Sequence, residues 1–253
     1  MRDRITTPQG RQIAFHRTPG QEPGVVFLGG FRSDMTGTKA IFLEDWARAR
    51  GRAYLRLDYS GHGASSGEFV DGCIGDWAED ALVALEALTE GPQVLVGSSM
   101  GGWIALLVAR ERAERVAGLV GIAAAPDFTE DLVWAHMPAA ERAILMSAGR
   151  VERPSAYSDA PYVYTRRLIE DGRRHLVLRG PLPLPFPVRL LQGTADADVP
   201  LAVALRLLDH ATGPDIRLTL MKDADHRMSS PDALRLIADS IAELLERTDA
   251  NIG

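Results

Sequence analysis

The sequence predicts an α/β fold, in which a mostly parallel, doubly wound sheet carries helices on both faces and a small helical cap. Short apolar runs alternate with amphipathic helical stretches along most of the chain, and this alternation breaks once, at about residues 127–186. The length of 253 residues suits one domain over residues 1–253 with the irregular stretch as an insertion.

The composition is that of an ordinary globular protein. Apolar residues make up 46% and charged residues 25%, which excludes disorder, collagen and coiled coil as the main state. The net charge of −6 argues against a nucleic-acid partner, because neutralising phosphates requires a basic face. The single cysteine, Cys73, excludes an internal disulfide and fits a spare loop thiol. No cluster of histidines and acids has metal-ligand spacing, so we expect neither a metal nor an organic cofactor.

The first half of the chain carries the clearest alternation. Its apolar runs predict strands over residues 25–28, 53–57, 93–96 and 116–123. Helical spacing of apolar residues predicts helices over residues 39–50, 76–89 and 101–112. These repeated strand–helix units are what predict the parallel sheet.

The alternation returns after residue 187. Strands are predicted over 188–191 and 216–220, with a helix over 201–210 between them. A last helix is predicted from Ser230-Pro231, a capping residue followed by proline, to about residue 247. The proline-rich segment 181–187 is expected to be a stiff, extended segment that connects the insertion back to the sheet.

The insertion is expected to cover the ligand site, because such folds bind ligands at the carboxyl ends of their strands. Helical patches are predicted over 130–147 and 162–175. Several of its apolar and aromatic residues could line an acyl pocket, although packing of the cap onto the body is the favoured role for most of them: Trp134, Met137, Leu145, Met146, Tyr157, Tyr162 and Tyr164.

Arginines are also concentrated in the insertion, at Arg166, Arg167, Arg173, Arg174 and Arg179. They could bind an anionic end of a substrate, such as a glucuronide or a CoA phosphate. Glu170 and Arg174 are i,i+4 neighbours, however, so a solvated helix face with salt bridges is the favoured interpretation.

One glycine-rich segment has the spacing of a nucleophile elbow. Gly97-Ser98-Ser99-Met100-Gly101 matches G-x-S-x-G, with a predicted strand before it and a predicted helix after it. A turn this tight needs small residues at Gly97 and Gly101, and it exposes the serine at a helix N-terminus that favours negative charge. Ser99 is therefore the candidate nucleophile, with an ordinary glycine-rich turn as the alternative.

A serine nucleophile needs a base, and the chain has six histidines. His226 lies between the last predicted strand and the last predicted helix, at the same sheet edge as Ser99. His62 also follows a strand and is its one rival. The remaining histidines lie outside this edge, so His226 is the candidate base.

The third catalytic group must hold the imidazole in the right tautomer. Asp196 and Asp198 both follow the strand predicted over 188–191, and both could serve. Asp196 is nearer the strand end, whereas Asp198 could cap the next helix. The chain order Ser99, Asp196, His226 is the order of this type of triad. For the oxyanion we expect main-chain N–H donors at Met100 and, after the first predicted strand, at Phe31.

Together these motifs resemble the α/β-hydrolase superfamily of serine hydrolases over essentially the whole chain. The elbow, the Asp196-x-x-Val199-Pro200 loop, His226 and the segment Asp58 to Ser65 carry this resemblance. The segment Gly30 to Ala40, Arg56 to Gly61 and the residues around the elbow are similar to a narrower family. It comprises mitochondrial palmitoyl-protein thioesterases that also act as mycophenolic acid acyl-glucuronide esterases. The resemblance implies Ser99, Asp196 and His226 as a triad.

This sequence departs from many superfamily members at Gly29, where they carry a histidine that braces the oxyanion loop. No transit peptide is evident, so the mitochondrial address does not carry over and a bacterial relative is expected. The N-terminus also lacks the apolar core of a signal peptide, and no apolar stretch is long enough to span a bilayer. We therefore expect a cytoplasmic protein.

The expected activity is hydrolysis of ester or thioester bonds of apolar acyl substrates through an acyl-serine intermediate. The substrate would be a small-molecule acyl ester or thioester, or an acylated protein. Two alternatives remain open: amide or peptide hydrolysis or perhydrolysis on the same triad, and a catalytically slow small-molecule binding protein that uses the pocket as a receptor.

Overall fold

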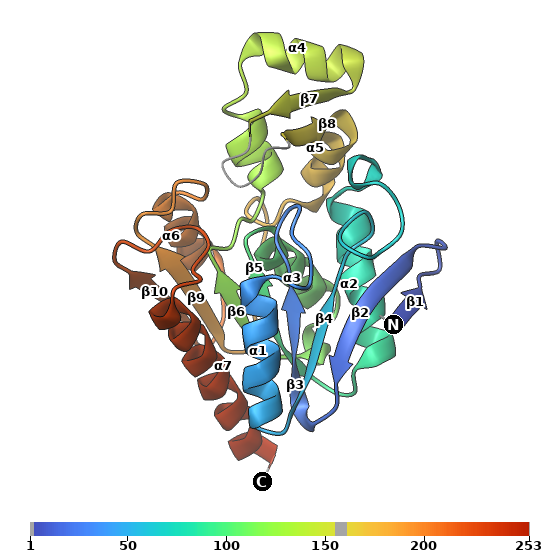
Figure 1. The fold of residues 1–253 in the computed structure, drawn as a ribbon. Helices are drawn as coiled ribbons and strands as arrows, with labels where there is room; N and C mark the ends of the chain where they lie inside the picture. The colour runs from blue at the N-terminus through green and yellow to red at the C-terminus, as the bar shows by residue number, and fades with distance from the viewer. Residues whose placement is uncertain (1–2, 155–160, 253) are drawn as a thin grey trace.

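A mostly parallel sheet forms the centre of the protein, which is seen in a computed structural model that describes residues 3–154 and 161–252. Within these residues the strands follow the order β1-β2-β4-β3-β5-β6-β9-β10 (Figure 1). Only β2 runs antiparallel to its neighbours β1 and β4. The strands are β1 (Asp3–Thr6), β2 (Gln12–Thr18), β3 (Gln21–Leu28), β4 (Arg52–Leu57), β5 (Gln93–Ser98), β6 (Val116–Ile122), β9 (Val188–Gly193) and β10 (Ile216–Met221).

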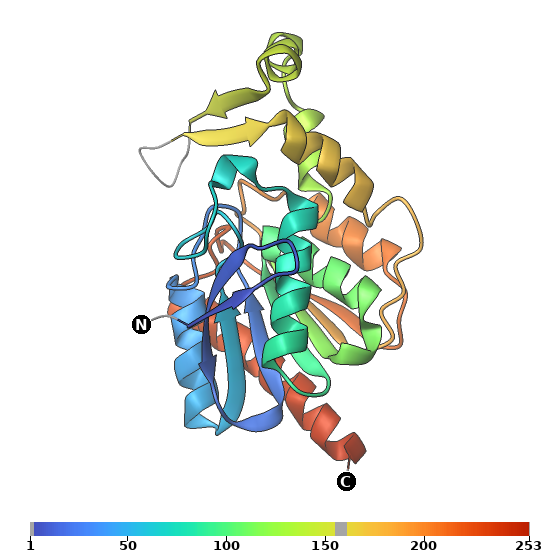
Figure 2. The same cartoon turned by 90° about the vertical axis from the view of Figure 1, so that its right-hand side faces the viewer.

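Helices cover both faces of this sheet. On one face α1 (Thr38–Ala49) and α7 (Pro231–Ile252) pack together, and on the other lie α2 (Ile74–Leu88), α3 (Met100–Glu111) and α6 (Leu201–His210) (Figures 1 and 2). Every residue of β5 is buried, as a central strand covered on both sides must be. Short turns of 3-10 helix lie at η1 (Phe69–Asp71), η2 (Ala113–Arg115) and η4 (Arg173–His175).

The sheet has its topological switch point between β3 and β5. The chain leaves β3 toward β4 on one side and then crosses to β5 on the other, so the loops after β3 and β5 diverge. A crevice outside the carboxyl ends of the strands forms at such a point, and ligands bind there in open α/β sheets.

Residues between β6 and β9 form a cap above this edge (Figure 2). It contains a short π-helical segment, η3 (Thr129–Trp134), followed by α4 (Ala139–Ala148), the hairpin of β7 (Arg150–Arg153) and β8 (Tyr162–Thr165), and α5 (Arg166–Gly172). The buried Asp127 ties the two ends of the cap together. Its carboxylate accepts hydrogen bonds from the N–H groups of Val177 at 2.8 Å and Leu178 at 3.0 Å.

The predicted fold class is confirmed, and two details of the cap are corrected. The helix predicted over 162–175 is wrong in its first part, because Tyr162–Thr165 pairs as strand β8 with β7. The Thr165 side chain then caps α5 by accepting a hydrogen bond from Leu168 N–H. The helix predicted over 130–147 is interrupted before Ala139, since Pro138 occupies the N-cap of α4.

Three other observations complete the fold. Strands β1 and β2 precede the first strand that the sequence predicts. In the proline-rich segment, Leu182, Leu184 and Phe186 are buried, each after an exposed proline, and Leu184 N–H donates to Thr212 O at 2.7 Å. Among the described residues, no helix combines the length and apolarity needed to cross a membrane.

Candidate active site

Ser99 lies at the end of β5, in the backbone conformation of a nucleophile elbow. Its φ of 55° and ψ of −120° are unusual for a residue other than glycine. A Cβ atom added at Gly97 would lie 2.3 Å from Gly101 O, and one added at Gly101 would lie 2.0 Å from Leu28 O. The turn therefore requires glycine at both positions, as the G-x-S-x-G pattern predicts.

Three side chains from three strand ends form a hydrogen-bonded chain. His226 Nε2 lies 3.1 Å from Ser99 Oγ, and His226 Nδ1 lies 2.9 Å from Asp196 Oδ2. Because the carboxylate can only accept, the imidazole proton belongs on Nδ1, which leaves the Nε2 lone pair facing the serine hydroxyl. This is the geometry in which a histidine can take a proton from a serine.

Asp196 is held by further donors besides His226. The N–H groups of Asp198 and Val199 donate to its Oδ1 at 2.9 and 2.8 Å, and Gln192 Nε2 donates to its Oδ2 at 2.9 Å. Burial raises the pKa of this carboxyl, but the hydrogen bonds outweigh burial and hold the pKa below its usual value. The structure thus places the Asp196 carboxylate against His226, while Asp198 contributes a main-chain N–H to that carboxylate.

The Asp196, Asp198 and His226 side chains also come close enough to suggest a cation site. Their potential ligand atoms lie within 4.8 Å of one another. His226 Nδ1 already donates to Asp196, however, and its Nε2 faces Ser99. The donor set therefore suits proton transfer better than metal coordination.

The rival histidine, His62, lies elsewhere. It is buried, and its Nε2 accepts a hydrogen bond from Arg32 N–H at 3.3 Å. The other histidines make contacts away from the serine: His16 with Glu44, His136 with Leu132 O, His175 with Asp171 and His210 with Gly180 O.

The loop after β3 lies against the serine. A Cβ atom added at Gly30 would meet Ser99 Cβ at 3.4 Å, so the backbone that precedes Phe31 passes close to the nucleophile. The side chain and N–H of Ser33 both donate to Gly30 O, at 2.8 and 3.2 Å, and form the turn. Within the described residues, neither Phe31 N–H nor Met100 N–H donates to another group of the protein.

Sequence reasoning missed two supports of this site. Tyr59 OH donates to Gly29 O at 3.3 Å, which braces the candidate oxyanion loop at Gly29, where this chain lacks a histidine side chain. The ammonium group of Lys39 donates to Arg227 O, directly after His226. Tyr59 belongs to a segment already used for the resemblance, but no local pattern relates either residue to the loop that it holds.

Aromatic side chains from the body and the cap surround Phe31. Its ring centroid lies 4.8 Å from Phe69 in the body, 5.6 Å from Phe128 at the start of the cap, and 5.8 Å from the stacked ring of Tyr164 in the cap. Tyr162 lies 5.9 Å away. The cap thus contributes apolar surface next to the candidate oxyanion donor.

The other cap residues named from the sequence have mixed roles. Met137 and Leu145 are buried and pack the cap, whereas Met146 is 40% exposed. The Trp134 ring lies under the guanidinium groups of Arg142 and Arg173. Tyr157 lies outside the described residues.

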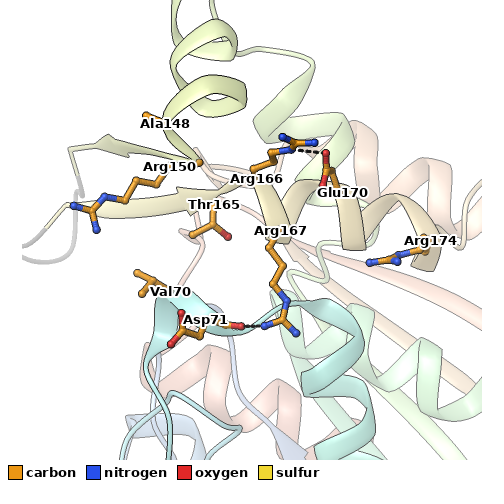
Figure 3. A pocket seen from close by; sticks show the side chains of 10 residues that line it. Val70, Asp71, Ala148, Arg150, Thr165, Arg166, Arg167, Glu170 and Arg174 are labelled. Carbon is orange, nitrogen blue, oxygen red and sulfur yellow. Dashed lines mark hydrogen bonds and ion pairs between the residues drawn. The ribbon is translucent and has the colours of Figure 1, made fainter.

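A depression of about 540 Å³, apart from Ser99, lies between the cap and η1, and arginines are among the residues that line it (Figure 3). Arg166 pairs with Glu170 at 2.6 Å, Arg167 with Asp76 at 2.8 Å and Arg174 with Asp171 at 3.2 Å. The other two arginines named from the sequence pair in the same way, Arg173 with Glu130 and Arg179 with Asp127 and Asp131. These pairs agree with the favoured salt-bridged interpretation, although Glu170 binds Arg166 rather than Arg174.

Cys73 lies in a loop, as predicted, and its thiol is free and buried. It precedes α2, and its Sγ donates to Asp76 Oδ2 at 3.1 Å. Burial raises the pKa of this thiol to about 12, so it stays protonated and unreactive at neutral pH.

Known proteins match this chain along nearly its whole length. A family model described as "Alpha/beta hydrolase family" matches residues 25–238. The "Palmitoyl-protein thioesterase ABHD10, mitochondrial" of Rattus norvegicus is 35% identical over 244 residues, which is 96% of this chain and 82% of the relative.

Two solved structures share the architecture closely. A putative hydrolase from Agrobacterium vitis S4 superposes with a TM-score of 0.93 at 44% identity, over 97% of this chain and 98% of that one. Alpha/beta hydrolase domain-containing protein 10 from mouse superposes with a TM-score of 0.91 at 33% identity, over 98% and 99%.

Proposed function

The chain belongs to the alpha/beta hydrolase family, and we propose that it cleaves ester or thioester bonds of apolar acyl substrates through an acyl-Ser99 intermediate. The observation that carries this proposal is the hydrogen-bonded chain from Ser99 through His226 to Asp196. Relatives named as thioesterases support ester or thioester hydrolysis as the reaction class.

In the first half-reaction, His226 Nε2 accepts the proton of Ser99 Oγ as this oxygen attacks the acyl carbonyl carbon. The negative charge that develops on the carbonyl oxygen is stabilised by the N–H groups of Phe31 and Met100. Asp196 stays ionised and stabilises the imidazolium. When the tetrahedral intermediate collapses, the bond to the leaving oxygen or sulfur breaks, and His226 returns the proton to the leaving group.

The second half-reaction repeats these steps with water. His226 takes a proton from a water molecule, whose oxygen attacks the acyl-Ser99 carbonyl carbon. The collapse of this second intermediate releases the carboxylic acid and returns the proton to Ser99 Oγ. The same two N–H donors serve both intermediates.

The apolar character of the acyl group is inferred from the aromatic side chains around Phe31. Rings from the body and from β8 in the cap place apolar surface beside the candidate donor. A small-molecule acyl ester or thioester is the proposed substrate, and an acylated protein would present the same thioester. The cytoplasmic location expected from the sequence stays a prediction.

The test combines active-site labelling with a substrate panel. A fluorophosphonate probe should label the wild-type protein but not Ser99→Ala, and turnover should be measured on p-nitrophenyl esters, acyl-CoA thioesters and aminoacyl amides. Hydrolysis of esters or thioesters that is lost in Ser99→Ala supports the proposal. Faster amide cleavage would favour a peptidase, and rapid labelling without any turnover would favour a receptor.

A further inference from the structure

His62 is enclosed in aromatic rings. The side chain is 3% exposed, and its ring centroid lies 5.6 Å from Tyr59, 5.1 Å from Phe69 and 5.1 Å from Trp77, with all three rings close to perpendicular. An ionised imidazole would lose its hydration in this site. Burial accordingly lowers the pKa of His62 to about 4.

Both ring nitrogens of His62 have partners that fix its tautomer. Nδ1 lies 3.2 Å from Ser60 O, and Nε2 lies 3.3 Å from Arg32 N. Because a carbonyl oxygen only accepts and a main-chain N–H only donates, the proton lies on Nδ1 and Nε2 acts as an acceptor. The two hydrogen bonds require the neutral ring.

The loop residue Ser60, which accepts the hydrogen bond from His62, is itself held by hydrogen bonds to α2. Ser60 O also accepts a hydrogen bond from Trp77 Nε1 at 3.0 Å. The N–H and hydroxyl of Ser60 donate to the buried Asp80 carboxylate at 2.8 and 2.7 Å. His62 is thus attached to the body through the loop after β4 and through α2, while its acceptor, Nε2, faces the loop after β3 and binds Arg32 N–H.

Arg32, whose N–H donates to His62, directly follows Phe31 and has a strained backbone that this hydrogen bond helps to hold. Its φ of 58° lies in the left-handed region that residues other than glycine rarely adopt. Its guanidinium carbon lies 5.5 Å from the centroid of the Phe69 ring, and its Nη1 donates to Pro161 O in the cap. Arg32 therefore connects the oxyanion loop to the body through its main chain and to the cap through its side chain.

We propose that His62 is a positioning residue, which as a neutral hydrogen-bond acceptor holds the Arg32 peptide and thereby fixes the Phe31 N–H beside Ser99. The proposal rests on the proposed function, since it assigns a support to the oxyanion donor of that reaction. A hydrogen bond to the Arg32 N–H fixes the orientation of the Phe31–Arg32 peptide and so restricts ψ of Phe31. The Phe31 N–H belongs to the adjoining Gly30–Phe31 peptide in the same tight turn, so its direction is restricted as well. Displacement of this donor would weaken stabilisation of the transition state more than it weakens binding of the substrate, so kcat falls more than KM changes.

The test compares two replacements of His62. His62→Phe fills the aromatic site without an acceptor, whereas His62→Gln offers a carboxamide whose oxygen can accept from Arg32 N–H and whose nitrogen can donate to Ser60 O. We expect kcat for the preferred ester to fall about 10- to 100-fold in His62→Phe with KM changed less than about 3-fold, because loss of one oxyanion donor costs about 100- to 1000-fold. In His62→Gln we expect kcat within about 5-fold of wild type.

Leu85→Ala is the control for lost stability, because it removes buried apolar atoms near the C-terminal end of α2. We expect this variant to be less stable than wild type but to keep the wild-type kcat. Wild-type kcat in folded His62→Phe, or an equal loss of kcat in both His62 variants, would overturn the proposal. If Ser99→Ala keeps its activity, the proposed function itself fails; if only the His62 variants behave unexpectedly, only the role of His62 fails.

A measurement on the wild-type protein covers the case in which His62→Phe does not fold. In protein labelled with ¹⁵N-histidine, with the His62 signals assigned by their absence from His62→Gln, we expect a protonated Nδ1 and an unprotonated Nε2 at pH 7. The opposite tautomer, or an imidazolium at this pH, would contradict an acceptor role.

Discussion

The carboxylate of Asp196 lies 2.9 Å from Nδ1 of His226, and these two residues come from loops that follow neighbouring strands, β9 and β10. The parallel pairing of Ile216–Met221 with Val188–Gly193 places both loops at one sheet edge. The acid and the base of the proposed relay are therefore brought together by strand register, and Ser99 joins them from β5.

This arrangement predicts that Asp196 and Asp198 differ in their effect on activity. Asp196→Asn removes the acceptor that holds the His226 tautomer, so kcat should fall by about 1,000- to 10,000-fold. Asp198→Asn keeps the main-chain N–H that Asp196 accepts and should lower kcat less than about 10-fold. Steady-state kinetics of both variants on one ester decide the matter. Equal losses, or a larger loss in Asp198→Asn, would reject Asp196 as the acid.

The elbow glycine should tolerate no side chain. In Gly101→Ala the new Cβ would lie 2.0 Å from Leu28 O, so the backbone around Ser99 must shift. We expect kcat/KM to fall at least about 100-fold, since a displacement of about 1 Å at a reacting group has that effect. Gly180→Ala is the matched control, because nothing lies within 4 Å of a Cβ there. Activity in Gly101→Ala similar to that of the control would show that the elbow geometry is wrong.

The value of kcat/KM should rise with the length of the acyl chain. A pocket that buries each added methylene gains about 0.8 kcal/mol, which corresponds to about a fourfold rise in kcat/KM per methylene until the pocket is full. Acetyl, butyryl, octanoyl and palmitoyl thioesters form the series, with aminoacyl amides beside them. A flat or falling trend together with faster amide cleavage would favour a peptidase.

The Asp171 carboxylate in the cap accepts a hydrogen bond from Gly75 N–H in α2 at 2.8 Å, and its contribution to stability should depend on pH. Burial raises the pKa of Asp171, but hydrogen bonds from His175 and from Gly75 N–H outweigh it and lower the pKa from 3.8 to about 2. Because the folded-state pKa is depressed, this carboxylate stabilises the fold by at most about 2 kcal/mol above pH 4, and this contribution is lost as the pH falls toward 2.

Asp171→Asn should accordingly lower the free energy of unfolding at pH 7, and its difference from wild type should shrink between pH 4 and pH 3. Urea unfolding at several pH values measures this difference. Asp45→Asn is the control, since Asp45 is an exposed partner of Arg48 and should contribute less than about 1 kcal/mol. A difference between Asp171→Asn and wild type that stays constant with pH would contradict the depressed pKa.

The sequence predicts those parts of the molecule whose structure follows from the residues next to them in the chain. Ser99, Asp196 and His226 each follow an apolar run, so their common edge follows from the rule that parallel strands end together. Helix 201–210 is predicted with the bounds of α6, because its apolar spacing and the preceding Pro200 both mark it.

The remainder depends on contacts between distant segments. Tyr162–Thr165 has a local pattern that fits helix or strand, and its pairing with Arg150–Arg153 decides for strand. His62 follows a strand and could be a base on sequence grounds. Its contacts with Arg32, thirty positions earlier, and with the Phe69 and Trp77 rings hold it away from Ser99.

The central claim is that the acyl group is carried by Ser99, and peptide mapping of the fluorophosphonate adduct tests it most directly. We predict one adduct per chain, on the peptide that contains Ser99, with ester or thioester hydrolysis falling in proportion to its formation. An adduct on another residue, or hydrolysis that persists after Ser99 is fully modified, would contradict the account.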